Sequence, residues 1–245
     1  MAADANSLNF TDQLLSPVRT STSPLLVWHS VGGERVELSG RVFDNWVAKS
    51  ANLLVEELDA GPGMVVALRL PAHWKSLALA LAVLHTGAEL LVPSPEGDGE
   101  AHHAGPVDIV AADDPMAAST EYPGAAVIGV ALGMLDLAFR GPAPDGMLDY
   151  AAEVRAFGDY FLPEAVAGGE PALRDASGSW AYSELFGARN PGGTALLGAG
   201  AGLGSALREA IGLWASGAAL VLLGEGVAPT DRLKGSERVE RVLGT

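Results

Sequence analysis

The fold is decided by residues 61–95, which read GPGMVVALRLPAHWKSLALALAVLHTGAELLVPSP. The continuous apolar run at 64–70 predicts a buried strand, residues 74–86 predict a helix, and residues 88–92 predict a second strand. Short turns join these elements, and such a strand–helix–strand unit is typical of a parallel sheet with a right-handed crossover. We therefore predict an α/β fold.

The residues before this unit predict a hairpin followed by a long helix. Residues 25–38, LLVWHSVGGERVEL, contain two β-rich runs around a Gly-Gly turn, which is a hairpin signal. Ser39 is a suitable N-cap for the helix, and Gly61-Pro62-Gly63 would end it. The apolar residues between these signals recur at helical spacing and are Phe43, Trp46, Val47, Ala51, Leu54 and Leu58.

The remaining chain continues the α/β pattern. Runs at 107–112 and 125–130 predict strands, and a short helix is expected at about 148–157. Gly168-Gly169 is the weakest point of the chain, so we expect two subdomains, 1–168 and 169–245. The second is expected to hold a strand at 194–198, a helix at 203–216 and a strand at 218–223.

Composition excludes several classes of function. The chain has 30 acidic and 15 basic residues and a formal charge of -15, so its surface would repel nucleic acid. It has no cysteine, which excludes disulfides, thiolate metal ligands and a Cys nucleophile. Residues 1–10 lack the features of a signal peptide, and the apolar stretch 77–92 is too short and too polar to cross a bilayer. We expect a cytoplasmic protein with neither nucleic acid nor membrane as a partner.

The order of three sequence phrases resembles a known superfamily. ELSG, GPGMVVALRLPAHW and LALAVLHTGAELLVPSP follow one another as in the opening of the AMP-binding, or adenylate-forming, enzymes, which include acyl-CoA synthetases. Residues 194–223 are similar to a later segment of those enzymes, and DNWVAKSANLL and DGMLDYAAEVRAFGDYF are similar to short AMP-binding-like proteins. The resemblance implies a truncated form of their large amino-terminal domain, with three layers and mostly parallel sheets flanked by helices.

The chain also departs from the family pattern. Members of the family bind the ATP phosphates with a Gly-rich loop that ends in Pro-Lys-Gly. Residues 150–223 contain no such motif. Its three lysines, Lys49, Lys75 and Lys234, do not follow a Gly-rich turn, and all five histidines lie at or before His103, ahead of the family's gate histidine. The resemblance further implies that the carboxy-terminal domain, which carries a catalytic lysine, is not represented in residues 1–245. We expect no adenylation by this chain alone; ATP, AMP or CoA is implied only by resemblance, and catalytic residues are unknown.

A Gly-rich turn between a strand and a helix is the sharpest site signal. Its glycines are Gly198, Gly200, Gly202 and Gly204. Such a turn lets a phosphate approach the backbone and the helix amino terminus. The turn matches neither GxGxxG nor GxxxxGK, so a flexible loop without a ligand is the alternative.

Further candidates follow the predicted strands, because ligands of open α/β sheets lie outside the carboxyl ends of the strands. His73 and Trp74 follow the first strand, Ser94 the next, and Asp113 and Asp114 the third. For each there is a structural alternative. His73 would cap a helix or lie on the surface, Trp74 would pack, and the aspartates before a proline would cap a turn.

Metal and serine chemistry are not expected. His102 and His103 lie beside Glu100, but adjacent side chains point apart and rarely share one ion. The chain has no G-x-S-x-G elbow, and Ser177-Gly178-Ser179 reads as a turn.

Three hypotheses of function remain. The first is a degenerate AMP-binding domain that retains a small ligand, nucleotide or acyl, at the strand ends. The second is a ligase-type enzyme that acts with a separate catalytic domain. The third is a non-catalytic protein that pairs with itself. Residues 236–242 could form a short terminal helix that docks on the sheet or on a second copy.

Overall fold

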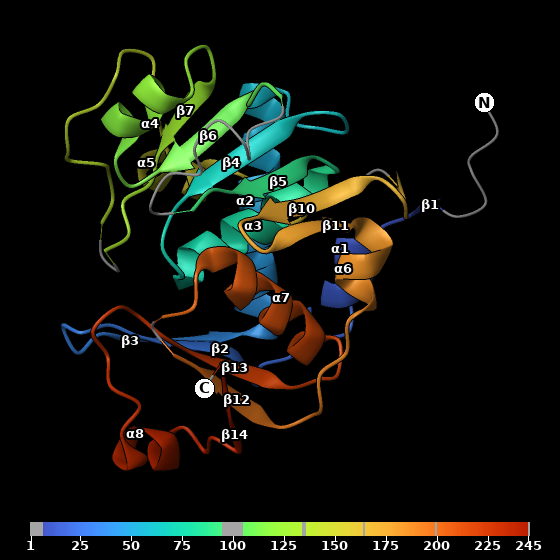
Figure 1. Cartoon of the computed structure of the whole chain (residues 1–245), viewed down its shortest axis with the longest axis vertical. Coiled ribbons are helices and arrows are strands. Elements are labelled where there is room, and N and C mark those ends of the chain that lie inside the picture. Colours follow the sequence, from blue (N-terminus) through green and yellow to red (C-terminus); the bar gives the residue numbers. More distant parts are fainter. Residues whose placement is uncertain (1–6, 95–104, 134–135, 164, 199, 245) are drawn as a thin grey trace.

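The structure, a computed structural model, describes residues 7–94, 105–133, 136–163, 165–198 and 200–244. Two larger sheets face each other across a layer of helices (Figure 1). This arrangement confirms the prediction of an α/β fold with mostly parallel sheets and flanking helices.

The first sheet has seven strands. In spatial order they are β11 (Gly178–Ala181), β10 (Pro171–Asp175), β5 (Glu89–Val92), β4 (Val65–Arg69), β6 (Ile109–Ala112), β7 (Ala126–Gly129) and β8 (Leu148–Asp149). Only β10 and β11 pair antiparallel, and every other neighbouring pair is parallel. The carboxyl ends of β10, β5, β4 and β6 therefore meet at one edge.

The second sheet has five strands. In order they are β14 (Arg241–Leu243), β12 (Thr194–Leu197), β13 (Ala219–Leu223), β2 (Pro24–His29) and β3 (Arg35–Ser39). The antiparallel pair is the predicted β2–β3 hairpin, and the other pairs are parallel. A separate two-stranded ribbon joins β1 (Ser7–Leu8) to β9 (Val166–Ala167).

Three helices fill the space between the sheets: α2 (Gly40–Leu58), α3 (Trp74–Thr86) and α7 (Leu203–Trp214). α3 contacts β2 of one sheet and β4 and β5 of the other, and α7 likewise contacts β13 and β10. Every residue of α3 is buried, which explains why its sequence is largely apolar on all sides. As predicted, the Ser39 hydroxyl caps α2 by accepting a hydrogen bond from the Val42 N–H.

Shorter elements surround this frame. They are α1 (Phe10–Leu15), α4 (Pro115–Glu121), α5 (Tyr150–Glu153), the 3-10 turn η1 (Val154–Ala156), α6 (Tyr182–Gly187) and α8 (Asp231–Ser236). In the described part of the chain, no helix combines the length and apolar character needed to cross a membrane.

The two sheets do not divide the chain at residue 168, where the sequence suggests a boundary. β2 and β3 come from the amino-terminal part, yet they complete the five-stranded sheet beside β13. β10 and β11 come from the carboxy-terminal part, yet they extend the seven-stranded sheet beside β5. Each sheet therefore needs strands from both parts.

The helix predicted at residues 236–242 is wrong. α8 ends at Ser236, and Arg241–Leu243 form strand β14 instead. β14 pairs parallel with β12, with Leu196 opposite Val242. The free edge of β12 offers hydrogen-bond partners to this segment, and that long-range pairing overrides its local helical pattern.

A buried tyrosine ties α6 to the central helix. The Tyr182 hydroxyl, fully buried, lies 3.1 Å from the Leu84 carbonyl oxygen and 2.9 Å from that of Ala88, and it donates to this pair. We expect Tyr182→Phe to lower the free energy of unfolding by about 1 kcal/mol, as measured by urea denaturation. The same change at Tyr160, which is 65% exposed, is expected to leave stability unchanged, and equal effects would contradict this role.

Candidate functional site

Two adjoining cavities follow the carboxyl ends of the strands in the seven-stranded sheet. The larger has a volume of about 530 Å³ and lies between the segments after β4, β5 and β10 and the start of α7. The smaller, of about 350 Å³, extends along the end of β6. Both are lined by Leu70, Pro71, Pro93, Ser94 and Glu225, so we treat them as one edge groove.

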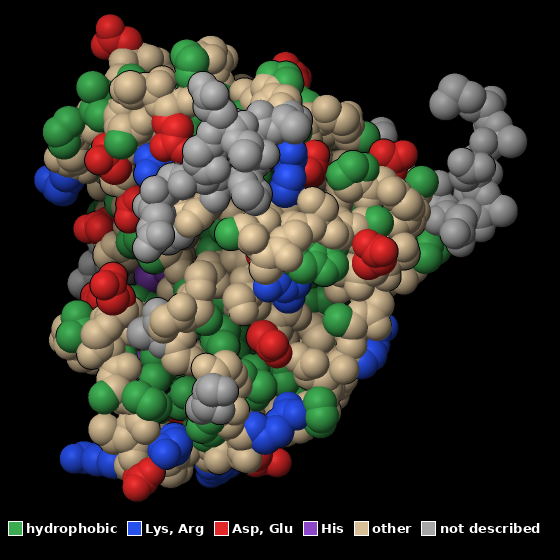
Figure 2. All heavy atoms as spheres, in the orientation of Figure 1, with side chains coloured by type: hydrophobic (Ala, Val, Ile, Leu, Met, Phe, Trp, Pro, Cys, Tyr) green, Lys and Arg blue, Asp and Glu red, His purple; other side chains and the backbone are tan. Residues whose placement is uncertain are grey.

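The edge groove runs between the two sheets. In the space-filling view it is a hollow with hydrophobic side chains inside and charged side chains on its margin (Figure 2). Its apolar lining comes from the carboxyl ends of strands in the seven-stranded sheet, from the Gly-rich turn and from the start of α7. These residues are Leu70, Val92, Ala176, Ala201 and Leu203.

Six of the residues suggested by the sequence lie together along this groove. Ser94, Gly200, Gly202 and Gly204 line the larger cavity, and Ser94, Asp113 and Asp114 line the smaller one. Parallel pairing explains the assembly, because it brings successive strand ends to one edge. Gly198 directly follows β12 but does not line either cavity.

His73 and Trp74 do not reach the groove. His73 is only 3% exposed, and its Nδ1 accepts a hydrogen bond from the Lys75 N–H at 3.1 Å, which caps α3. Its ring packs against Trp28 with centroids 4.3 Å apart, and Trp74 packs against Trp46. His73 thus caps a helix and Trp74 packs in the core, which are the structural alternatives to a ligand site.

The two aspartates after β6 have different roles. Asp114 caps α4 by accepting a hydrogen bond from the Ala117 N–H at 3.0 Å. Both aspartates line the smaller cavity, and desolvation there raises the pKa of the Asp113 carboxyl. The nearby Arg69 is paired with Glu121 at 3.1 Å, so its charge is compensated from outside the groove.

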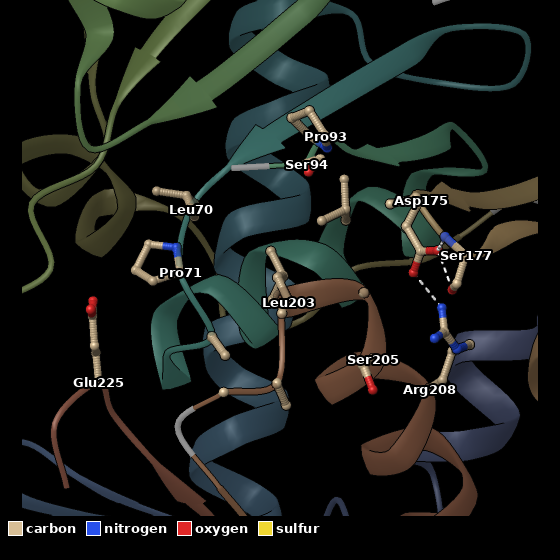
Figure 3. Close-up of a pocket in the computed structure, with 17 residues that line it drawn as sticks. Leu70, Pro71, Pro93, Ser94, Asp175, Ser177, Leu203, Ser205, Arg208 and Glu225 are labelled. Atoms are coloured by element: carbon tan, nitrogen blue, oxygen red, sulfur yellow. Dashed lines mark hydrogen bonds and ion pairs between the residues drawn. The ribbon is translucent and has the colours of Figure 1, made fainter. Parts of the chain in front are cut away.

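Three charged residues of the larger cavity were missed by the sequence analysis: Asp175, Arg208 and Glu225. Asp175 ends β10, and its carboxylate accepts hydrogen bonds from the Ser177 N–H and hydroxyl at 2.7 and 2.6 Å. It also forms an ion pair with Arg208 of α7 (Figure 3). Glu225 lies on the opposite side of the cavity.

One signal could have identified Arg208. It follows Gly204 by four residues on the predicted helix, so the two lie on the same face beside the Gly-rich turn. Asp175 gave no such signal, because β10 was not predicted. Its approach to α7 depends on long-range pairing between β10 and β5.

Metal binding has no support from the described residues, since no group of three or more His, Asp or Glu side chains gathers among them. The histidine pair considered as a metal site, His102 and His103, lies outside the described residues, as does the nearby Glu100.

Comparison with known proteins places the chain in a family. No protein-family model matches it. A TIGR03089 family protein from Mycobacterium tuberculosis (strain ATCC 25618 / H37Rv) is 37% identical over 223 residues, which cover 86% of this chain and 87% of that protein. The chain belongs to the TIGR03089 family.

Solved structures confirm that this TIGR03089 family chain has the fold seen in adenylate-forming enzymes. An acyl-CoA synthetase from Brucella canis superimposes with a TM-score of 0.74 and 17% identity, over 99% of this chain and 48% of that one. Acetoacetyl-CoA synthetase from Streptomyces lividans gives 0.68 and 18%, over 89% and 38%. A variant of an amide bond synthetase from Marinactinospora thermotolerans gives 0.67 and 17%, over 95% and 47%. The chain therefore shares their fold and spans less than half of their length.

The polyphosphate of ATP, expected only from the family resemblance of the sequence, does not fit the described residues of the edge groove. Its acidic residues, Asp113, Asp114, Asp175 and Glu225, outnumber its two arginines. Both arginines are already paired with carboxylates. A phosphate chain in this groove would add negative charge, and the described groove residues include no free cation to balance it.

Proposed function

We propose that this TIGR03089 family chain is a ligand-binding domain that does not adenylate carboxylic acids by itself. It binds a small ligand, acyl or nucleoside in character, in the edge groove. The observation that supports this proposal is the lining of the groove, which is apolar in its interior and has both arginines neutralised.

The shape and the lining of the groove suit such a ligand. Pockets that bind small molecules have volumes of roughly 300 to 1,000 Å³ and mostly apolar walls with a few polar groups. The larger cavity has about 530 Å³ and combines an apolar lining with the hydroxyls of Ser94, Ser177 and Ser205. An acyl or nucleoside group would bury apolar surface there, whereas a polyphosphate would meet carboxylates.

Thermal denaturation in the presence of candidate ligands tests this function, because a ligand that binds only the native state raises its stability. The panel contains ATP, AMP, CoA, an acyl-adenylate analogue and a series of uncharged acyl amides. We expect at least one ligand without a phosphate chain to raise the melting temperature, and ATP to have no effect. If no member of the panel stabilises the protein, the proposed binding is wrong.

A matched pair of variants links binding to the groove. Ala176 is an exposed residue of the lining, and Ala176→Trp is expected to fill the mouth of the larger cavity and abolish the shift. Ala188 is also exposed but lies outside both cavities, so Ala188→Trp is expected to retain it. Loss of the shift in both variants, or in neither, would contradict binding in the groove.

The catalytic part of the proposal has its own test. We expect the isolated chain to show no ATP-dependent pyrophosphate exchange with a panel of carboxylic acids. Clear exchange would overturn this part and favour the ligase-type alternative.

A further inference from the structure

We propose that Asp175 determines the ligand specificity of the edge groove by occupying, from within the protein, the position that a ligand's anionic group would take beside α7. This inference rests on the proposed function, since it names the class of ligand that the groove admits. That class is an acyl compound whose polar end carries no negative charge.

The first observation is the position of the Asp175 carboxylate relative to α7. An added Cβ on Gly204, the second residue of α7, would overlap the Asp175 carboxylate oxygen and lie 2.9 Å from its Cγ. The carboxylate therefore lies against the first turn of the helix. The first backbone N–H groups of a helix lack intrahelical partners and attract negative charge. Gly202, the N-cap residue, offers no side chain to satisfy them.

The carboxylate is also held firmly in this position. Its side chain is 9% exposed, and it accepts hydrogen bonds from both the N–H and the hydroxyl of Ser177. Arg208 supplies the opposite charge and stacks over the Trp180 ring, 4.2 Å from its centroid. Three elements thus fix one internal anion at the point where the Gly-rich turn meets α7.

The consequence for ligands follows from charge. The helix amino terminus and an arginine together form a site that favours an anion. Because Asp175 already supplies that anion, a phosphate or carboxylate of a ligand meets a like charge instead. Without the Asp175 carboxylate, Arg208 would remain beside the amino terminus of α7 and would lack its ion-pair partner. The same position would then attract anions.

Titration calorimetry with inorganic pyrophosphate tests this inference. The wild-type chain is expected to show no saturable binding at millimolar concentrations. Asp175→Asn keeps an oxygen that can accept from the Ser177 N–H but removes the charge, and it is expected to raise the affinity at least about tenfold. The double variant Asp175→Asn with Arg208→Gln is expected to lose that gain. Asp175→Ser serves as a second test, and each variant is first checked for a cooperative melt.

Glu225→Gln is the matched control. It removes one negative charge from the same groove, but on the side opposite Arg208. If Glu225→Gln raises the affinity as much as Asp175→Asn, the effect is a general one of charge and the inference is wrong. It is equally wrong if folded Asp175→Asn and Asp175→Ser bind pyrophosphate no better than the wild type. These results are separate from the proposed function, which fails instead if no member of the ligand panel stabilises the wild-type chain.

Discussion

Replacing Gly40 with alanine is expected to lower the free energy of unfolding by about 3 kcal/mol, because the added methyl group has no room. Gly40 begins α2, and an added Cβ would overlap the carbonyl oxygen of Val18 and lie 2.8 Å from its Cβ. That carbonyl already accepts a hydrogen bond from the Ser21 N–H at 2.8 Å. Relief therefore requires movement of backbone, which is far less adaptable than the end of a side chain.

Gly235 provides the matched control for this substitution. It lies in α8, and nothing is within 4 Å of a Cβ added there. Gly235→Ala is expected to leave stability unchanged or to raise it by less than about 1 kcal/mol, since alanine favours helix over glycine. Urea denaturation measures both variants. A loss below about 1 kcal/mol for Gly40→Ala would show that the segment around Val18 can move aside at little cost.

Lowering the pH from about 7.5 to about 5.5 is expected to remove about 1.3 kcal/mol of stability for each of two buried histidines. Burial lowers the pKa of His73 to about 3 and that of His85 to about 4. A histidine of the unfolded chain titrates near pH 6.5, so below this pH the unfolded state binds protons that the folded state does not. The stabilisation is present above about pH 6.5 and is lost as the pH falls toward the folded pKa values.

The substitution His73→Asn isolates one of these contributions. Asparagine is a favourable N-cap residue that can accept the Lys75 N–H, and it does not titrate. The difference in unfolding free energy between the two pH values is expected to shrink by about 1.3 kcal/mol relative to wild type, since the carboxylates titrate alike in both proteins. Both pH values lie above the pI of about 4.6. An unchanged difference would contradict a buried, neutral His73.

Elements with a strong local pattern could be predicted from the sequence. The apolar runs between Met64 and Val92 became β4, α3 and β5, and the Gly-Gly turn marked the β2–β3 hairpin. Elements that depend on distant pairing could not. β10 has only two buried residues, Ala172 and Leu173, and its place beside β5 is set by the fold. Strand β14 likewise depends on distant pairing, with β12, so the local pattern of its sequence wrongly predicts a helix.

The site residues that follow a strand could be predicted from the sequence. The site residues that form an ion pair could not. Ser94 and Asp113 each follow a recognisable strand, so their common edge could be expected from parallel topology. His73 also follows a strand, but the start of α3 turns it into the interior. Asp175 and Arg208 are 33 residues apart, and nothing in the sequence between them indicates that they form an ion pair.

The exchange of strands between the two sheets has a consequence for how the chain reaches its folded state. Leu26 of β2 lies opposite Leu220 of β13, so the five-stranded sheet cannot close until nearly all of the chain is available. Closing such long loops costs entropy before any contact repays it, and folding slows accordingly. Until then the β2–β3 hairpin would have exposed apolar side chains and an unpaired edge, with which β13 later pairs. Exposed apolar side chains and unpaired strand edges of this kind make the incompletely folded chain prone to aggregation.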